Sequence, residues 1–243
     1  MSSLAIITIC RDDRAGLERT FASLHAQSDQ RFMHVVVDGG STDGSGELIQ
    51  SHAHRIARWV SEPDGGIYAA MNKGWRMAEA DFILFINSGD GLADADAVAR
   101  CLPLLDEGID IAYGDLLLDE ADGSRRVKAY PDRIDTLWLL RESPPHPSQC
   151  MSRALLERWG GFEERYRIAA DYAFFARAFW RGGLRLRKLP FTVGRFDTTG
   201  LSSSEEHRAR LLAERKDIQR RYAPWPWYMA YQGWAAFNRT IGR

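Results

Sequence analysis

Short β-rich runs alternate with amphipathic segments through the first third of the chain. Four such runs cover residues 4–9, 32–37, 56–60 and 82–86. After the first run, Leu17, Phe21 and Leu24 recur at the spacing of one helix face. Strands and helices that alternate in this way favour a parallel sheet of right-handed βαβ units. The sequence therefore predicts an α/β fold with a mostly parallel, Rossmann-like sheet flanked by helices.

The composition indicates a folded protein with one large domain. The chain has 243 residues, 45% of them hydrophobic, which is enough to bury a sizeable core. Its 32 basic and 33 acidic residues nearly cancel, so it lacks the positive field that drives nucleic-acid binding. Three widely spaced cysteines, Cys10, Cys101 and Cys150, argue against a disulfide framework or a zinc site. Since the N-terminus also lacks a signal peptide, we expect a cytoplasmic protein.

The rest of the chain predicts further helices and a mixed or antiparallel edge. The Asp122-Gly123 pair is typical of a hairpin turn. Strands are expected at residues 109–113, 116–118, 125–130, 149–151 and 184–196, and helices at 93–106, 137–140, 154–159, 172–180 and 204–221. An aromatic tail follows at residues 222–237. We expect one domain over residues 1–203 and a C-terminal helical and aromatic extension over residues 204–243.

The fourth run ends abruptly in the polar sequence Asn87-Ser88-Gly89-Asp90. Ligands of open α/β sheets bind at the carboxyl ends of the strands. Asp90 is therefore placed where its carboxylate could hold a divalent cation against a phosphate, because hard cations prefer oxygen ligands. The alternative is a plain turn, since Ser, Gly and Asp are all favoured turn residues.

The second run ends at Asp38, which opens a glycine-rich loop. Such a loop lets the backbone approach a ligand closely. A carboxylate at the strand end could accept hydrogen bonds from a uracil ring or from ribose hydroxyls. A dinucleotide-binding fingerprint is the alternative, but the spacing Gly-x-Gly-x-x-Gly is missing. Asp43 is expected to cap the helix that follows.

Four motifs occur in order along this part of the chain. They are Thr8-Ile9-Cys10-Arg11, the loop of residues 38–44, the segment of residues 61–74 and Asn87-Ser88-Gly89-Asp90. In order and spacing they resemble the family 2 glycosyltransferases of bacterial polysaccharide synthesis, over residues 3–200. The resemblance implies a GT-A fold, a nucleoside-diphosphate sugar donor, dependence on a divalent metal, Mn²⁺ or Mg²⁺, and inversion at the anomeric carbon.

The resemblance also implies which residues bind the donor. Thr8 and Asp38 match family positions at the nucleoside, and Asp64 lies in a stretch that commonly contacts the base or the ribose. Lys73 matches a basic position that faces the donor, where a cation would neutralise diphosphate charge.

For the metal, Asp90 matches the last acid of the family's acidic element. The sequence departs from the family here, because Asn87 and Gly89 stand where acids are often found. The metal would therefore be held by Asp90, an amide oxygen of Asn87 and the donor phosphates.

Two later residues complete the expected site. Asp171 looks like the family's late acid, whose carboxylate takes the proton of the acceptor hydroxyl as general base. A helix N-cap is its alternative role, and both can hold. His146 lies in a proline-bracketed loop where related enzymes carry site residues. It could contact the diphosphate, the metal or the acceptor, or lie on the surface.

The C-terminal part leaves several interpretations open. Residues 198–204 resemble a flexible loop that closes over the donor, or they form a connector. Beyond them, a helix rich in arginine precedes a run of tryptophan and tyrosine, which suits the headgroup region of a membrane. Prolines and polar residues keep this run too short to span a bilayer. Alternatively, it packs on the catalytic domain or on a second subunit of a homodimer.

Together these features predict an inverting glycosyltransferase that moves a sugar from a nucleoside-diphosphate donor to a glycan or lipid-linked acceptor in cell-surface polysaccharide synthesis. If the extension binds lipid, the protein works at the inner face of the cell membrane. Because Asn87 and Gly89 stand where acids are often found, a non-catalytic nucleotide-sugar binding subunit is the alternative. A sugar nucleotidyltransferase is the third hypothesis, but residues 8–15 lack the glycine-rich run that a triphosphate needs.

Overall fold

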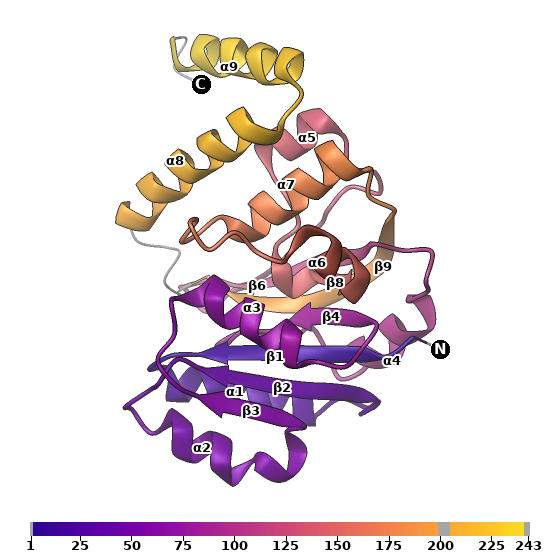
Figure 1. Ribbon diagram of the computed structural model, residues 1–243, viewed down its shortest axis with the longest axis vertical. Coiled ribbons are helices and arrows are strands. Elements are labelled where there is room, and N and C mark those ends of the chain that lie inside the picture. Colours follow the sequence, from indigo (N-terminus) through magenta and orange to yellow (C-terminus); the bar gives the residue numbers. More distant parts are fainter. Residues whose placement is uncertain (1, 199–204, 241–243) are drawn as a thin grey trace.

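The first four β-rich runs form parallel strands at one side of a single sheet. In the computed structural model, which describes residues 2–198 and 205–240, these residues form a nine-stranded sheet of order β3-β2-β1-β4-β8-β6-β9-β5, with β7 paired to β6 (Figure 1). The parallel strands are β1 (Leu4–Cys10), β2 (Phe32–Asp38), β3 (Arg58–Ser61) and β4 (Phe82–Phe85). The predicted α/β class is confirmed.

The second half of the sheet mixes strand directions. It contains β5 (Gly91–Leu92), β6 (Ile111–Asp119), β7 (Arg125–Lys128), β8 (Gln149–Ser152) and β9 (Leu186–Asp197). β8 pairs antiparallel with β4 and β6, whereas β6 and β9 are parallel. The hairpin turn at Asp122-Gly123 is confirmed, because β6 and β7 pair antiparallel across it.

One prediction for this half was wrong. Residues 109–113 and 116–118 do not form two separate strands, because β6 runs unbroken between them. Its pairing with β9 shifts register between Tyr113 and Leu116. Gly114 lies at this irregularity, and a side chain there would come within 2.5 Å of the Phe191 carbonyl oxygen. The glycine that interrupts the apolar pattern therefore marks a point where two strands approach each other closely, and it does not end a strand.

Helices cover both faces of the sheet. They are α1 (Arg14–His25), α2 (Ser45–Ser51), α3 (Ile67–Met77), α4 (Ala97–Cys101), α5 (Thr136–Arg141), α6 (Arg153–Trp159), α7 (Ala170–Gly182), α8 (Glu205–Tyr222) and α9 (Trp225–Thr240), with short 3-10 turns at Ala53–Arg55, Leu102–Leu104 and His146–Ser148. The helix expected at residues 93–106 is shorter than predicted. It is preceded by β5, which pairs with β9, and by the turn that follows β5. At its other end, Pro103, which lacks an amide hydrogen, lies in the 3-10 turn that follows α4.

Alternating side chains of β1 contribute to the cores on the two faces of the sheet. Ala5, Ile7 and Ile9 face the side covered by α3, α6 and α7. Leu4 and Ile6 face the opposite side, where they pack with residues of α1 and α4. This alternation is what a strand buried on both faces requires.

The C-terminal helices lie outside this layered body. α8 packs on α7, and α9 contacts α5 and α8 at the end of the molecule (Figure 1). The aromatic tail of the prediction is therefore a regular helix. The expected donor-covering segment lies outside the described residues except for Thr198, and the division of the chain at residues 203 and 204 stays a prediction. Within the described parts of the chain, every helix is too short or too polar to cross a bilayer.

Candidate active site

The carboxyl ends of the four parallel strands meet at one edge of the sheet, on the left in Figure 1. Two of the loops at this edge pack against each other through glycines. Gly40 has a positive φ of 77°, and a side chain there would lie 3.0 Å from the Pro63 nitrogen. At Gly39 a side chain would come within 2.8 Å of the Asp64 carboxylate. The glycine-rich loop after β2 thus lets the loop after β3 approach.

The two nucleoside candidates are buried beneath these loops. Asp38 is fully buried, and its carboxylate accepts hydrogen bonds from the Ser41 amide at 3.1 Å, from the Ser61 hydroxyl at 2.5 Å and from the Ser41 hydroxyl. Thr8 is also fully buried, with its hydroxyl 3.1 Å from Nε2 of His34. Both side chains hold the ends of β1, β2 and β3 together, and neither reaches the surface.

The other two donor candidates lie nearer to solvent. The Asp64 carboxylate accepts a 2.8 Å hydrogen bond from the Gly66 amide at the start of α3. Lys73, on α3, is 2.7 Å from the Glu62 carboxylate, and both side chains are partly exposed. A diphosphate near Lys73 would therefore compete with Glu62 for its ammonium group.

A side chain of α1 fixes the backbone of the loop after β4. Thr20 is fully buried, and its hydroxyl donates to the Asp90 carbonyl at 2.7 Å and accepts from the Gly89 amide at 3.1 Å. The same hydroxyl is 3.1 Å from the Asn87 carbonyl oxygen. Gly89 has a positive φ of 90°, a conformation that glycine adopts without steric cost. The turn that places Asp90 is thus specified by a glycine and by one helix hydroxyl.

His146 brings the two most distant site candidates together. Its Nε2 is 3.7 Å from the Asp90 carboxylate, and its Nδ1 is 3.5 Å from the Asp171 carboxylate. β8 lies beside β4, so the turn before β8 places His146 next to the loop after β4. Asp171 reaches the same point from the first turn of α7. The structure therefore groups Asp90, His146 and Asp171, with the side-chain amide of Asn87 2.9 Å from Nε2 of His146.

The two carboxylates differ in protonation behaviour. Burial lowers the pKa of His146, but hydrogen bonds and charge from Asp171 and Asp90 outweigh this and raise it to about 9. Burial raises the pKa of Asp90 above its ordinary value, and His146 only partly opposes the increase. Burial acts in the same way on Asp171, but hydrogen bonds from His146, the Tyr172 amide and Tyr68 leave its pKa below the ordinary value. The pKa of Asp171 is therefore lower than that of Asp90, and Asp171 is ionised at neutral pH.

The Asn87 amide can match either charge state of His146. Its nitrogen donates to Nε2 of a neutral ring, whereas its oxygen would accept from the protonated ring. The nitrogen faces the ring only when His146 is neutral, and the Asn87 oxygen is then buried and has no hydrogen-bond partner among the described residues. This orphaned oxygen lies in the same loop as the Asp90 carboxylate.

Such a pair of oxygens fits a hard divalent cation, Mn²⁺ or Mg²⁺. In the described part of the chain, no three His, Cys, Asp or Glu side chains surround a common metal position. A cation held by Asp90 and Asn87 would therefore need further oxygen ligands from a bound diphosphate. The ligand set that the sequence suggested stays a prediction.

Asp171 does not cap α7, as the alternative interpretation had it. Ala169 occupies the N-cap position, and Asp171 follows within the first turn, where it accepts a 2.7 Å hydrogen bond from the Tyr172 amide. The Tyr68 hydroxyl lies 3.2 Å from the Asp171 carboxylate and 2.7 Å from the Ile168 carbonyl oxygen.

The expected cap of α2 is only partly as predicted. The Asp43 carboxylate accepts a 3.0 Å hydrogen bond from the Ser45 amide, although Gly44 is the N-cap residue of α2.

Sequence reasoning missed two residues that support this site, Thr20 and Tyr68. Thr20 lies on the apolar face that Leu17, Phe21 and Leu24 define, and a polar residue on such a face was an available signal. Tyr68 lies within one of the four motifs, but its contact with α7 depends on how α3 and α7 pack.

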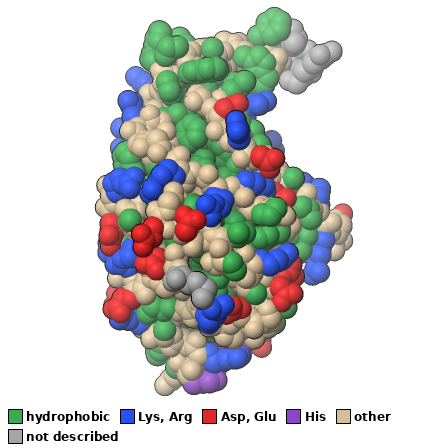
Figure 2. Space-filling view, turned by 90° about the vertical axis from the view of Figure 1, so that its right-hand side faces the viewer, with side chains coloured by type: hydrophobic (Ala, Val, Ile, Leu, Met, Phe, Trp, Pro, Cys, Tyr) green, Lys and Arg blue, Asp and Glu red, His purple; other side chains and the backbone are tan. Residues whose placement is uncertain are grey.

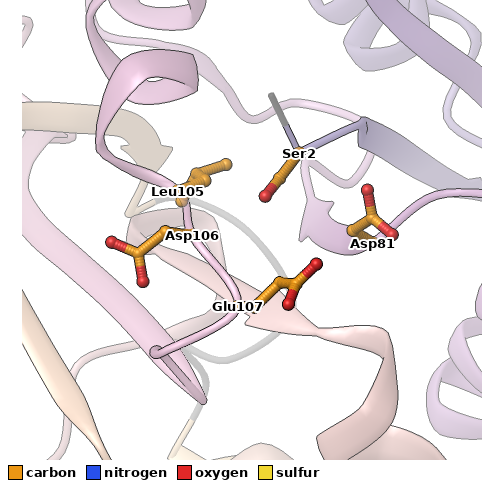
Figure 3. Close-up of a pocket in the computed structure, with 5 residues that line it drawn as sticks. All are labelled: Ser2, Asp81, Leu105, Asp106 and Glu107. Carbon is orange, nitrogen blue, oxygen red and sulfur yellow. The ribbon is translucent and has the colours of Figure 1, made fainter.

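A pocket at the opposite edge of the sheet is separate from this site. It has a volume of about 280 Å³, and Figure 3 shows three carboxylates around it, those of Asp81, Asp106 and Glu107. Asp81 directly precedes β4 and Ser2 lies two residues before β1, so the pocket lies at the amino ends of these strands. Ligands of open α/β sheets bind at the other edge.

Comparison with known proteins agrees with the geometry. The model of the family "Glycosyl transferase family 2" matches residues 5–162. The uncharacterized glycosyltransferase Rv1514c of Mycobacterium tuberculosis is 33% identical over 229 residues, which cover 90% of this chain and 85% of that protein. The PGL/p-HBAD biosynthesis glycosyltransferase Rv2957 of the same organism is 28% identical over 183 residues, which cover 73% and 70%.

Solved structures share the fold at low identity. The mannosyltransferase PcManGT of Pyrobaculum calidifontis, in complex with GDP-Man and Mn²⁺, has a TM-score of 0.70 at 18% identity, covering 92% of this chain and 65% of that one. Residues 1–349 of TarS from S. aureus, in complex with UDP, give a TM-score of 0.67 at 17% identity, covering 91% and 67%. From the family match and this fold, the chain belongs to glycosyl transferase family 2 and has a GT-A fold.

Proposed function

We propose that this protein is an inverting glycosyltransferase that moves one sugar from a nucleoside-diphosphate sugar to a hydroxyl of a glycan or lipid-linked acceptor. The observation that carries the proposal is the convergence of Asp90 and Asp171 on His146. A donor-anchoring carboxylate and an ionised carboxylate then lie on two sides of one imidazole. Family membership, and the nucleotide or nucleotide sugar in the neighbouring structures, support a nucleotide-sugar donor.

In this mechanism Asp171 is the general base. The acceptor oxygen attacks the anomeric carbon from the face opposite the diphosphate, and the Asp171 carboxylate takes the hydroxyl proton. The bond between the anomeric carbon and the diphosphate oxygen breaks, and its electron pair stays on the diphosphate. His146 and Tyr68 hold the Asp171 carboxylate in place and ionised before the reaction.

The donor would bind along the carboxyl ends of β1 to β4. Asp38 and Thr8 fix the loops that form the nucleoside pocket, and Asp64 offers a carboxylate to the base or the ribose. Lys73 would move from Glu62 to the diphosphate. Asp90 and Asn87 would hold a divalent cation, which when bound supplies positive charge to the departing diphosphate.

The test separates donor binding from transfer. Calorimetry with UDP, GDP, dTDP and CDP, each with and without Mn²⁺, should find one diphosphate that binds tightly only with the metal. Asp90→Asn should lose this metal-dependent binding. Asp171→Asn should bind as the wild type does but transfer about 10²- to 10⁴-fold more slowly. Asp106→Asn, in the pocket at the opposite edge, is the control and should change neither property.

Two results would contradict the proposal. If no diphosphate binds under any condition, the donor site is absent. If Asp171→Asn transfers sugar at nearly the wild-type rate, Asp171 is not the base.

The second candidate function is a nucleotide-sugar binding subunit without catalysis. The observation that favours it is the acidic loop itself, where Asn87 and Gly89 replace acids and only Asp90 remains. Metal-dependent donor binding without transfer to any member of a broad acceptor panel, and without slow donor hydrolysis, would favour this function over the first.

A further inference from the structure

α9 exposes large apolar side chains instead of burying them. Trp225 is 70% exposed and Phe237 is 62% exposed, and three more residues of this helix, Trp227, Met229 and Trp234, are also exposed. Residues 225–238 contain no Asp, Glu, Lys or Arg. Figure 2 shows hydrophobic side chains gathered at the α9 end of the molecule. At 3.6 residues per turn these five residues lie on several sides of α9, and we call them together the aromatic face. A face of this kind on a soluble protein marks an interaction site.

α8, next to this face, exposes several cations, whereas two of its four acids bind to the body of the protein. The Glu214 carboxylate accepts hydrogen bonds from the backbone amides of residues 167–169, and the Asp217 carboxylate accepts one from the Tyr166 hydroxyl. Both acids therefore point into the body of the protein. Four cations of α8 are exposed and form no ion pair with a described residue: Arg208, Arg210, Lys216 and Arg220.

We propose that α8 and α9 together form a docking surface for an anionic lipid bilayer. The exposed cations of α8 complement the phosphates of anionic lipids, and the tryptophans of the aromatic face suit the boundary between headgroups and acyl chains. The 16 residues of α9 would lie along the membrane plane, since the helix is too short to cross a bilayer.

A second copy of the chain fits this surface less well. A symmetric dimer pairs the same patch on both subunits, so the exposed cations of α8 would face each other. Glu214 and Asp217 cannot neutralise them, because both carboxylates are bound to residues 166–169. An anionic bilayer removes this repulsion, whereas a dimer increases it.

Co-sedimentation of the full chain with vesicles tests the surface. Vesicles of phosphatidylcholine mixed with phosphatidylglycerol should bind the protein, and vesicles of phosphatidylcholine alone should bind it much more weakly. Lys216→Gln and Arg220→Gln should each weaken binding to the anionic vesicles roughly fivefold, because each cation near such a surface is worth about 1 kcal/mol. The single variant Arg55→Gln, which removes one exposed charge far from α8, is the matched control and should bind normally.

Substitutions in the aromatic face test its contribution to vesicle binding. Trp227→Ser and Trp234→Ser should each lower vesicle binding by about tenfold, and Trp59→Ser, which removes an exposed tryptophan from β3, should leave it unchanged. Nucleoside-diphosphate binding serves as an independent readout of the fold and of the proposed function. Light scattering that finds a dimer broken by Trp227→Ser, with no vesicle binding, would assign the face to a second copy and overturn the proposal. Equal binding to neutral and anionic vesicles, or no binding to either, would also overturn it.

Discussion

At the scale of single residues, the Thr20 hydroxyl fixes the loop that carries Asp90 through hydrogen bonds to its backbone. Thr20→Val keeps the side-chain shape but leaves the Gly89 amide and the Asp90 carbonyl without their partner. We expect it to lower the free energy of unfolding by about 1–3 kcal/mol and to weaken metal-dependent binding of nucleoside diphosphates. Urea denaturation and calorimetry measure the two effects.

Thr20→Ser separates the hydroxyl from the methyl group. It retains both hydrogen bonds and loses only one buried carbon, which costs about 0.8 kcal/mol. Diphosphate binding by this variant should stay close to that of the wild type. Equal binding by Thr20→Val and Thr20→Ser would mean that the hydroxyl does not position the loop.

Single residues of the site could be predicted, but their contacts could not. Asp90 follows an apolar run, and Asp171 and His146 were recognised by resemblance to a family. Their convergence depends on β8 lying antiparallel beside β4, a pairing of segments far apart in the chain. Sequence patterns within one segment carry no information on such a pairing, so the grouping around His146 required the structure.

At the scale of elements, the contact between α3 and β1 depends on Gly74. A side chain there would come within 2.5 Å of Cγ2 of Ile7, which is fully buried. Gly74→Ala should therefore lower the free energy of unfolding by about 1–3 kcal/mol through overpacking. Thermal and urea unfolding would measure this loss.

Gly46→Ala in α2 is the matched control. No atom lies within 4 Å of the position that its side chain would occupy, and the helix gains from the loss of glycine flexibility. This variant should be as stable as the wild type or more stable by about 0.5–1 kcal/mol. If both variants had the same stability, close packing of α3 on β1 would not be what requires glycine at position 74.

Elements differ in how well the sequence predicted them. β1 and β2 agree with the predicted ranges to within one residue, and α1 carries the predicted helix face, because each has a strong apolar pattern of its own. β6 and α4 do not, since Gly114 and Pro103 have effects that depend on neighbouring strands and turns. α9 was predicted as an aromatic tail because its tryptophans do not mark one buried face.

At the scale of the whole molecule, a cluster of histidines links α1, α2 and β2. The rings of His25, His34 and His52 all pack around Phe21, with centroid distances of 6.0, 5.6 and 5.1 Å. Burial lowers the pKa of His34 to about 3. Burial and the neighbouring Arg55 and histidines lower the pKa of His25 to about 4. The folded protein therefore holds the rings of His25 and His34 neutral at a pH where an unfolded chain would protonate them.

The sign of the resulting pH dependence follows from these shifts. Above pH 6.5, the ordinary value, the rings are neutral in both states and contribute no pH dependence. As the pH falls from 6.5 toward the folded values, the unfolded state binds more protons, so the free energy of unfolding decreases. For His34 the loss at pH 5 is about 2 kcal/mol. Urea unfolding at pH 7 and pH 5 should show it in the wild type.

His34→Gln isolates this effect from every other titrating group. Glutamine can still bond to Thr8 but cannot be protonated, so the variant should lose about 2 kcal/mol less than the wild type between pH 7 and pH 5. Comparing the two proteins cancels the carboxylates, including Asp90, whose raised pKa acts in the opposite direction. Because His34 bonds to Thr8 at the end of β1, acid should weaken the nucleoside side of the site together with the fold. An identical loss in both proteins would place the acid sensitivity outside this cluster.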